Sequence, residues 1–168
     1  MKRFFGIFFA SFLLIGCGYK PSTQYQNKIV GNNVKVEVDI SAENPREGVF
    51  LKDAVRDAVF SVFHKNLCFS DCDTTLIINS ASNSLSAIDF DKNGYPIIYR
   101  STVNLKVTLI DKNSKTRTYS VSGSYDFNVA AQGIVTDQMK LEAYKRAAIN
   151  ALNKLIANIT KDGAENDD

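Results

Sequence analysis

The sequence predicts an α+β fold, a two-layer sandwich with two helices packed on one face of a mainly antiparallel four-stranded sheet. Four segments alternate apolar and polar residues as strands do, and two segments repeat apolar residues every three or four positions as helices do. Their order along the chain is β-α-β-β-β-α. Each strand has one face rich in serine, threonine, asparagine or charge, so only one side of the sheet needs a helical cover.

The first strand and the first helix are joined by a loop. Residues 34–40 alternate strictly, with valine and isoleucine on one side and charged residues on the other. Pro45 and Gly48 indicate that the following segment is a loop. A helix is expected from Phe50 onward, and its apolar stripe comprises Phe50, Leu51, Ala54, Val55, Ala58, Val59, Val62 and Phe63. His64, the single histidine, falls near the end of this helix, where we expect a capping or surface role.

Three further strands complete the expected sheet. Serines blur the alternation of residues 74–90, which indicates a β-bulge or an edge position. Asn93-Gly94 predicts a type I′ hairpin turn. The strand at residues 97–110 directs Tyr99, Val103, Leu105, Val107 and Leu109 to one face. The strand at residues 117–129 does the same with Tyr119, Val121, Tyr125, Phe127 and Val129.

A second helix is expected from Asp137 to Ile159, with Thr136 as its N-cap. Its apolar stripe comprises Leu141, Tyr144, Ala148, Ala151, Leu152, Leu155, Ile156 and Ile159. Residues 161–168 form a short acidic tail that we expect to be disordered. Residues 33–160 are long enough for one domain with one core.

The N-terminus has the pattern of a secretory signal. Lys2 and Arg3 precede an apolar run from Phe4 to Ile15, which is shorter than the ~18–20 residues that span a bilayer. The run ends in Leu14-Ile15-Gly16-Cys17, which resembles the bacterial lipobox. The resemblance implies that residues 1–16 are removed and that Cys17 is acylated, with residues 17–32 as a tether. Gly18 in place of aspartate favours sorting to the outer membrane.

Charge and cysteine content narrow the function classes. Removal of Lys2 and Arg3 leaves 18 basic and 18 acidic side chains, so bulk charge gives no indication of a nucleic-acid partner. Cys68 and Cys72 remain in the mature chain, and an even pair in an oxidising compartment indicates a disulfide. Free thiols remain an alternative; the C-x3-C spacing fits neither a zinc site nor the C-x-x-C redox motif.

The sequence offers little support for catalysis or for a cofactor. Residues 89–94, "DFDKNG", match the first half of a calcium loop, but the twelfth position holds Arg100 in place of an acid. The glycines of a G-x-S-x-G motif are missing around Gly123. With one histidine and no acid–base pair, we expect a binding or scaffold protein that is not an enzyme and has no cofactor.

One basic cluster is a candidate binding site. Lys112, Lys115 and Arg117 lie in and just after the turn between the last two strands, and Arg100 and Lys106 lie on the polar strand face behind it. Basic side chains at a loop tip can pair with the phosphate groups of a glycolipid. A solvated turn is the simpler alternative.

Several segments together resemble the LptE family of outer-membrane lipoproteins, which take part in lipopolysaccharide assembly. The matching segments are "CGYKP", "LKDAVRDAV", "GYPIIYRSTVNLKVTLID", "YDFN" and "EAYKRAAINALNKLI", in that order from Cys17 to Ile159. The resemblance implies two helices on a four-stranded sheet. It also implies a plug inside the LptD β-barrel that supports barrel assembly, binds lipopolysaccharide and assists its transport to the cell surface.

The resemblance also implies site residues. Family members contact lipopolysaccharide through basic side chains at one end of the domain, for which Lys112, Lys115 and Arg117 are the nearest equivalents. The second basic position of the family falls near Gly133–Thr136, where this chain has no lysine or arginine. Cys68 and Cys72 are not part of the family pattern. The alternative is a periplasmic lipoprotein that activates a peptidoglycan synthase or assists an ABC-type lipid transporter.

Overall fold

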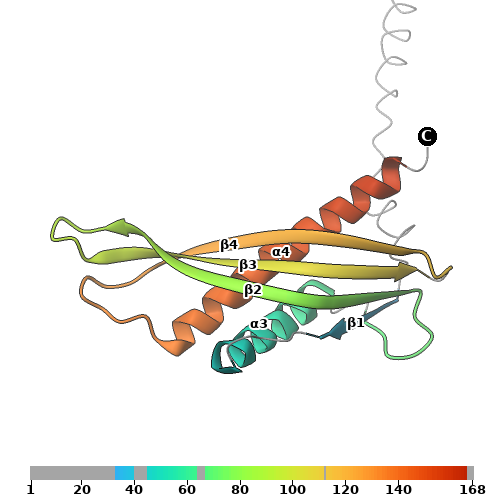
Figure 1. The fold of residues 1–168 in the computed structure, drawn as a ribbon, viewed down its shortest axis with the longest axis horizontal. Helices are drawn as coiled ribbons and strands as arrows, with labels where there is room; N and C mark the ends of the chain where they lie inside the picture. Colours follow the sequence, from blue (N-terminus) through green and yellow to red (C-terminus); the bar gives the residue numbers. More distant parts are fainter. Residues whose placement is uncertain (1–32, 40–44, 64–66, 112, 166–168) are drawn as a thin grey trace, which may run out of the picture.

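A computed structural model describes residues 33–39, 45–63, 67–111 and 113–165. The elements are β1 (Val34–Val38), α3 (Pro45–Phe63), β2 (Thr74–Phe90), β3 (Pro96–Asp111), β4 (Thr116–Asn128) and α4 (Asp137–Glu165). The sheet has the order β1-β2-β3-β4, and both helices cover the same face of it (Figure 1). Only β1 and β2 pair in parallel, so the sheet is mixed but mainly antiparallel. The predicted fold is confirmed.

The serine-rich strand β2 is both bulged and, for most of its length, an edge. β1 pairs only with residues 74–78, from Val34 opposite Thr74 to Val38 opposite Ile78. A register shift between Ile78 and Ser80 then moves the inward positions by one. As a result the inward-facing residues change from Leu76 and Ile78 to Ala81, Asn83, Leu85 and Ala87. Both interpretations of the blurred alternation are therefore confirmed.

The two hairpin turns have the same construction. Asp91 Oδ1 accepts hydrogen bonds from the N–H groups of Asn93 (2.9 Å) and Tyr95 (2.8 Å). Asp111 Oδ1 likewise accepts from the N–H groups of Asn113 (2.8 Å) and Lys115 (2.9 Å). The fourth residue of each turn has a positive φ, 84° at Gly94 and 60° at Ser114.

The predicted type I′ turn is therefore wrong, although the hairpin is where it was expected. A type I′ turn needs positive φ at both central residues, but Gly94 alone has it here, and the ring of hydrogen bonds to Asp91 favours a longer loop. The same bonds give the carboxylate of Asp91 a structural role in the segment that resembles half a calcium loop.

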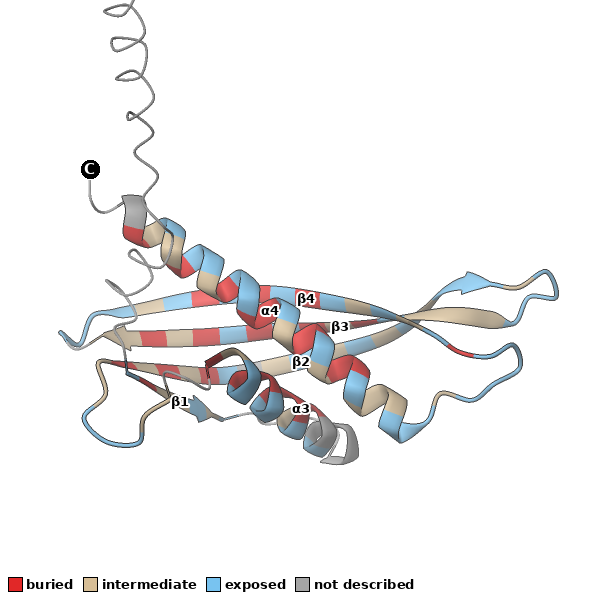
Figure 2. Ribbon diagram, turned by 180° about the vertical axis from the view of Figure 1, so that it is seen from behind, coloured by how far each residue is buried: buried red, intermediate tan, exposed pale blue. Residues whose placement is uncertain are grey.

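The helices bury one continuous core against the sheet (Figure 2). α4 crosses β3 and β4, while α3 packs against α4 and covers β1. Gly123 lies where α4 crosses β4, because a Cβ atom there would overlap the carbonyl O of Ala147 and the N of Ala151. The fully buried core side chains include Leu51, Val55, Leu76, Ile78, Val103, Leu105, Val107, Leu109, Leu152, Leu155 and Ile159.

Two helix boundaries differ from the sequence-based expectation. α3 begins at Pro45, so the predicted loop over Pro45 and Gly48 is wrong; proline is compatible with the first turn of a helix because that N–H has no intrahelical acceptor. α4 continues to Glu165, so residues 161–165 are helical and not a disordered tail. Thr136 is confirmed as the N-cap, since its Oγ1 accepts a hydrogen bond from Met139 N at 3.2 Å.

Candidate functional site

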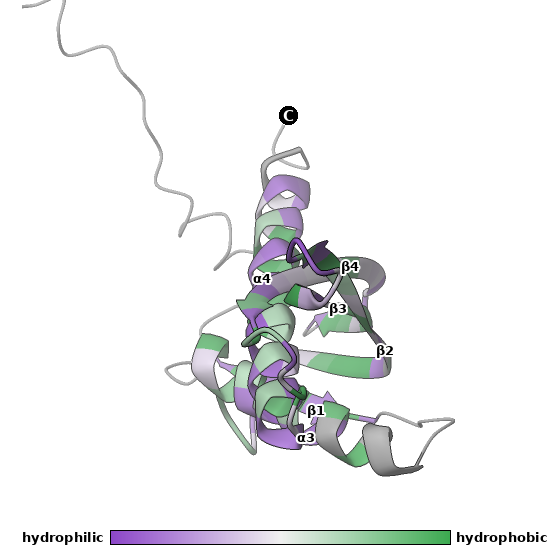
Figure 3. Ribbon diagram, turned by 90° about the vertical axis from the view of Figure 1, so that its left-hand side faces the viewer, coloured by the Kyte–Doolittle hydropathy of each residue, from purple (hydrophilic) through white to green (hydrophobic). Residues whose placement is uncertain are grey.

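The side of the sheet that faces away from the helices is polar along the middle of three strands, and Ile77, Ile98 and Ile110 lie on this side toward the ends of the sheet. Figure 3 shows both helices on one side of the strands. We call the opposite side the polar sheet face. It comprises Ser82, Ser84 and Ser86 of β2, Arg100, Thr102, Asn104, Lys106 and Thr108 of β3, and Thr118, Ser120, Ser122, Ser124, Asp126 and Asn128 of β4. Strand register aligns these residues in rows, such as Ser84, Thr102 and Ser124.

Hydrogen bonds across the strands link parts of the polar sheet face. Asn79 Nδ2 donates to Thr108 Oγ1 at 2.5 Å, and Asn104 Nδ2 donates to Ser82 Oγ at 3.3 Å. A shallow depression of about 340 Å³ lies beside this second pair and is lined by Ala81, Ser82, Asn104, Leu105, Lys106, Ser120, Val121 and Ser122. Its walls present hydroxyl, amide and ammonium groups, which can donate and accept hydrogen bonds.

Arg100 is bound within the polar sheet face and is poorly placed to hold a phosphate. Its Nε and Nη2 donate to the two carboxylate oxygens of Asp126 at 2.7 and 2.8 Å. The hydrogen bond and the opposite charge raise the pKa of Arg100, and the same hydrogen bond lowers the pKa of Asp126. Two hydrogen bonds to the same carboxylate leave the charge of Arg100 compensated by Asp126 and not available to a phosphate group.

The structure places Arg117 of the predicted basic cluster on a different side of the sheet from Lys106 and Arg100. Lys115 is exposed in the β3–β4 turn, and Lys112 lies outside the described residues. Arg117 is opposite the buried Leu109, so it faces the helix layer, whereas Lys106 is on the polar sheet face. Burial and the carboxylate of Asp162 raise the pKa of Tyr119, and the nearby charge of Arg117 opposes this rise. Arg117 and Lys106 therefore do not belong to the same surface.

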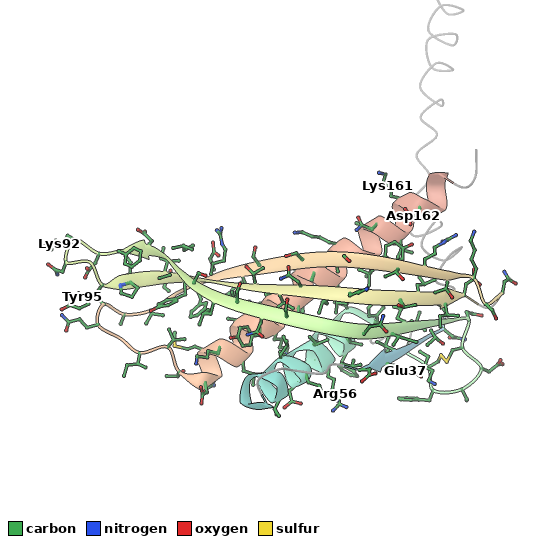
Figure 4. All side chains as sticks on the ribbon, viewed as in Figure 1. Glu37, Arg56, Lys92, Tyr95, Lys161 and Asp162 are labelled. Carbon is green, nitrogen blue, oxygen red and sulfur yellow. A yellow bond between two sulfur atoms is a disulfide. The ribbon has the colours of Figure 1, made fainter. Side chains whose placement is uncertain are left out.

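The two loops that the family resemblance would combine into one site lie at opposite ends of the domain. The turn with Lys115 precedes β4, and the segment Gly133–Thr136 follows it, so the whole length of β4 separates them (Figure 1). The β2–β3 hairpin lies at the Gly133–Thr136 end, and Figure 4 labels Lys92 and Tyr95 on it. Lys92 is exposed there and was missed by the sequence analysis. Lys92 and Gly133 are far apart in the sequence, so the sequence alone did not indicate that they lie at the same end of the domain.

Tyr119 and Asp162 join the last turns of α4 to β4. The hydroxyl of Tyr119 donates to Asp162 Oδ2 at 2.8 Å. Burial and then the hydrogen bond to this carboxylate raise the pKa of Tyr119 to about 12. The contact explains why α4 continues beyond the predicted end of the helix.

Cys68 and Cys72 are joined by a disulfide, with a Cα–Cα distance of 6.0 Å. The loop that contains them, residues 67–73, is hydrogen-bonded to the start of β1. Cys68 N donates to Val34 O at 3.0 Å, and Asp73 N donates to Asn33 O at 2.9 Å. We call this segment the disulfide loop. Cys17 and His64 lie outside the described residues.

A second depression, of about 310 Å³, lies between the far end of β4 and the first turns of α4. It is lined by Tyr125, Phe127, Asn128, Thr136, Gln138, Met139, Glu142 and Ala143. The ring of Phe127 stacks on Tyr99 with centroids 5.9 Å apart, and the guanidinium of Arg146 lies 5.1 Å from the centroid of the Tyr125 ring. This partly apolar site was also missed, because helix start and strand end meet there only in the folded chain.

The described residues contain no cluster of three or more histidine, cysteine, aspartate or glutamate side chains that could hold a metal ion. Ser101 is fully buried, and within the described part of the chain its Oγ has no hydrogen-bond partner. Neither α3 nor α4, the two described helices, has the length and apolarity that a membrane crossing requires.

No family model and no curated protein sequence matches the chain. Several solved structures are similar to it in fold. Rare lipoprotein B from Shewanella oneidensis is 14% identical, with a TM-score of 0.46 over 74% of this chain and 95% of that one. A protein assigned as a lipoprotein in Caulobacter crescentus CB15 is 15% identical, with a TM-score of 0.48 over 86% and 96%. The minor lipoprotein from Acinetobacter baumannii is 8% identical, with a TM-score of 0.46 over 76% and 91%.

These solved structures are of bacterial lipoproteins, but TM-scores below 0.5 do not establish a shared function. The surfaces of this chain are therefore the basis from which its function is inferred.

Proposed function

We propose that this protein is an outer-membrane lipoprotein that occupies the lumen of a large β-barrel, LptD, supports its assembly and assists the transport of lipopolysaccharide to the cell surface. It would act as a binding and scaffold protein without a catalytic step of its own. The observation that carries the proposal is the polar sheet face, which extends over three strands and is covered by neither of the two described helices.

A surface of this composition suits the water-lined interior of a wide barrel. Hydroxyl groups both donate and accept hydrogen bonds, so rows of serine and threonine can pair with a polar wall directly or through water. Interior walls of large outer-membrane barrels are polar and filled with water. An apolar sheet face would instead require a dry, apolar partner.

The N-terminal sequence supports attachment to a membrane. Acylation of Cys17 would hold the chain at the bilayer through a tether that ends at Asn33, the first described residue. Several acyl chains make such attachment effectively permanent. Attachment raises the effective concentration of the domain near a membrane-embedded partner.

Among the predicted lipopolysaccharide contacts, Lys115 is best placed to reach a phosphate group. It is exposed at the base of the β3–β4 turn, while Arg117 faces the helix layer beside Tyr119. Lys112 remains a candidate from the sequence alone. If the glycolipid instead binds at the Gly133–Thr136 end, Lys92 is the exposed cation of the nearby hairpin.

The proposal is tested by affinity purification of the mature, acylated protein from detergent-solubilised outer membranes, with mass spectrometry of the proteins that stay bound. We expect a large β-barrel protein in near-equal amount. The double variant Ser84→Arg/Ser120→Arg places bulk and charge on the polar sheet face and should lose the barrel. Asp53→Arg, on the exposed side of α3, is the matched control and should retain it.

Two results would contradict the proposal. One is recovery of a peptidoglycan synthase or an inner-membrane transporter without a barrel, which would support the alternative class of lipoprotein. The other is undiminished recovery of the barrel with the double variant, which would show that the polar sheet face does not contact it.

A further inference from the structure

The disulfide loop lies at the point where the N-terminal tether enters the domain. Its backbone N–H groups at Cys68 and Asp73 donate to the carbonyls of Val34 and Asn33. The main chain of Asn33 donates in return to Asp73 Oδ2 at 3.1 Å. The first described residues of the chain are thus fixed to this loop by hydrogen bonds in both directions.

The tip of the disulfide loop presents an aromatic side chain to solvent. Phe69 is 93% exposed, the highest value among the large apolar side chains of the described residues. It follows Cys68 directly and lies inside the ring closed by the Cys68–Cys72 disulfide. The disulfide and the hydrogen bonds of Cys68 and Asp73 restrain the loop that carries this exposed side chain.

The disulfide loop, which carries Phe69, is at the end of the sheet to which the tether is joined. Fifteen residues separate Cys17 from Asn33, so even a fully extended tether reaches about 50 Å. β3 has 16 residues, which gives the sheet a length of about 50 Å. The disulfide loop is at the tethered end of the sheet, while the β2–β3 hairpin is at the opposite end (Figure 1).

We propose that Phe69 inserts into the boundary between headgroups and acyl chains of the bilayer that holds the acylated Cys17, and so orients the domain with its disulfide loop on the membrane. The inference rests on the proposed acylation of Cys17. A single exposed aromatic side chain binds a bilayer weakly, but the tether keeps it at a high local concentration. Exposed Asp71 in the loop and Lys115 in the neighbouring turn carry opposite charges, so the contact is with a lipid surface that need not be anionic.

The chain contains no tryptophan, so a single introduced indole reports its own surroundings. We would compare Phe69→Trp with the matched control Ile134→Trp. Ile134 is 84% exposed in the loop that follows β4. Each acylated, full-length mature variant is reconstituted in phosphatidylcholine vesicles with brominated acyl chains, and quenching and emission wavelength are measured after flotation. Matched vesicles without bromine give the reference.

We expect Phe69→Trp to be quenched and shifted to the blue, and Ile134→Trp to be neither. The population with the loop at position 69 on the membrane should exceed all other orientations by about tenfold to a hundredfold, the ratio that corresponds to burial of an aromatic side chain. Adding Cys68→Ser/Cys72→Ser to the Phe69→Trp variant should reduce the quenching, since the ring no longer holds the side chain outward. Admixture of anionic lipid should change little.

The outcomes separate the two levels of the proposal. A chain that does not float with the vesicles contradicts the acylated anchor and, with it, the membrane contact. A chain that floats, but whose indole at position 69 is unquenched, contradicts the membrane contact alone. Equal quenching at positions 69 and 134 would overturn the inferred orientation.

Discussion

Replacement of Gly123 by alanine tests whether α4 is seated directly on β4. A Cβ atom at this position would overlap the carbonyl O of Ala147 and the N of Ala151, which are backbone atoms that cannot rotate aside. Restoring an ordinary contact would lift the helix by about 1 Å, and a gap of that size removes up to about half of the dispersion energy along the interface. Ala151, Leu152 and Leu155 are at most 1% exposed at this interface.

We expect Gly123→Ala to lower the free energy of unfolding by about 3 kcal/mol, at the upper end of the cost of overpacking a core. In a strand without this contact the same substitution would stabilise by about 0.5–1 kcal/mol, so the two cases differ in sign. Urea unfolding of the non-acylated mature chain, followed by circular dichroism, measures the difference. A midpoint equal to or above that of the unsubstituted chain would refute the direct seating of α4 on β4.

Three other changes test separate features of the fold. Gly94→Ala should lower the free energy of unfolding by about 1 kcal/mol, because the positive φ of 84° is unfavourable for alanine while no atom lies within 4 Å of the added methyl group. A decrease of about 3 kcal/mol or more in urea unfolding would contradict this expectation. Cys68→Ser/Cys72→Ser should lower the free energy of unfolding by about 2 kcal/mol, the entropic contribution expected for so short a closed loop. It should also speed amide hydrogen exchange in β1, because the loop is hydrogen-bonded to that strand. Unchanged exchange in β1 would show that the disulfide does not stabilise the strand. Tyr119→Phe loses the hydrogen bond to Asp162 and should be less stable at neutral pH. The pKa of Tyr119 is raised from 10.0 to about 12, so its contribution is complete below pH 10 and is lost as pH rises toward 12; phenylalanine cannot ionise, and a variant with the same alkaline decline would contradict this assignment.

Local periodicity was sufficient to predict the layers of the fold but not the contacts between distant segments. The alternation in β3 and β4 identified the buried residues because a strand with one covered face has a period of two. The same alternation contained a signal that the sequence analysis did not use. Arg117 has the parity of Tyr119, and so it belongs to the helix-facing side and not to a cluster with Lys106.

Other features depend on non-local contacts that one sequence does not reveal. The acidic composition of residues 161–168 suggested disorder, yet Asp162 accepts a hydrogen bond from Tyr119, 43 residues earlier, and α4 continues past it. The type of the first hairpin turn depends on the hydrogen bonds of Asp91, which compete with the Asn-Gly preference. The separation of Lys115 from Gly133–Thr136 follows from the length and direction of β4.

The most direct test of the central claim is the accessibility of the polar sheet face in intact outer membranes. Ser84→Cys and Ser120→Cys would each introduce a single reactive thiol, since Cys68 and Cys72 are joined to each other and an acylated Cys17 has no free thiol. We predict that a water-soluble maleimide labels both positions rapidly in the purified protein and slowly in membranes, where a barrel wall covers them. Equal labelling rates in the two preparations would contradict the claim that the polar sheet face is the surface bound by the barrel.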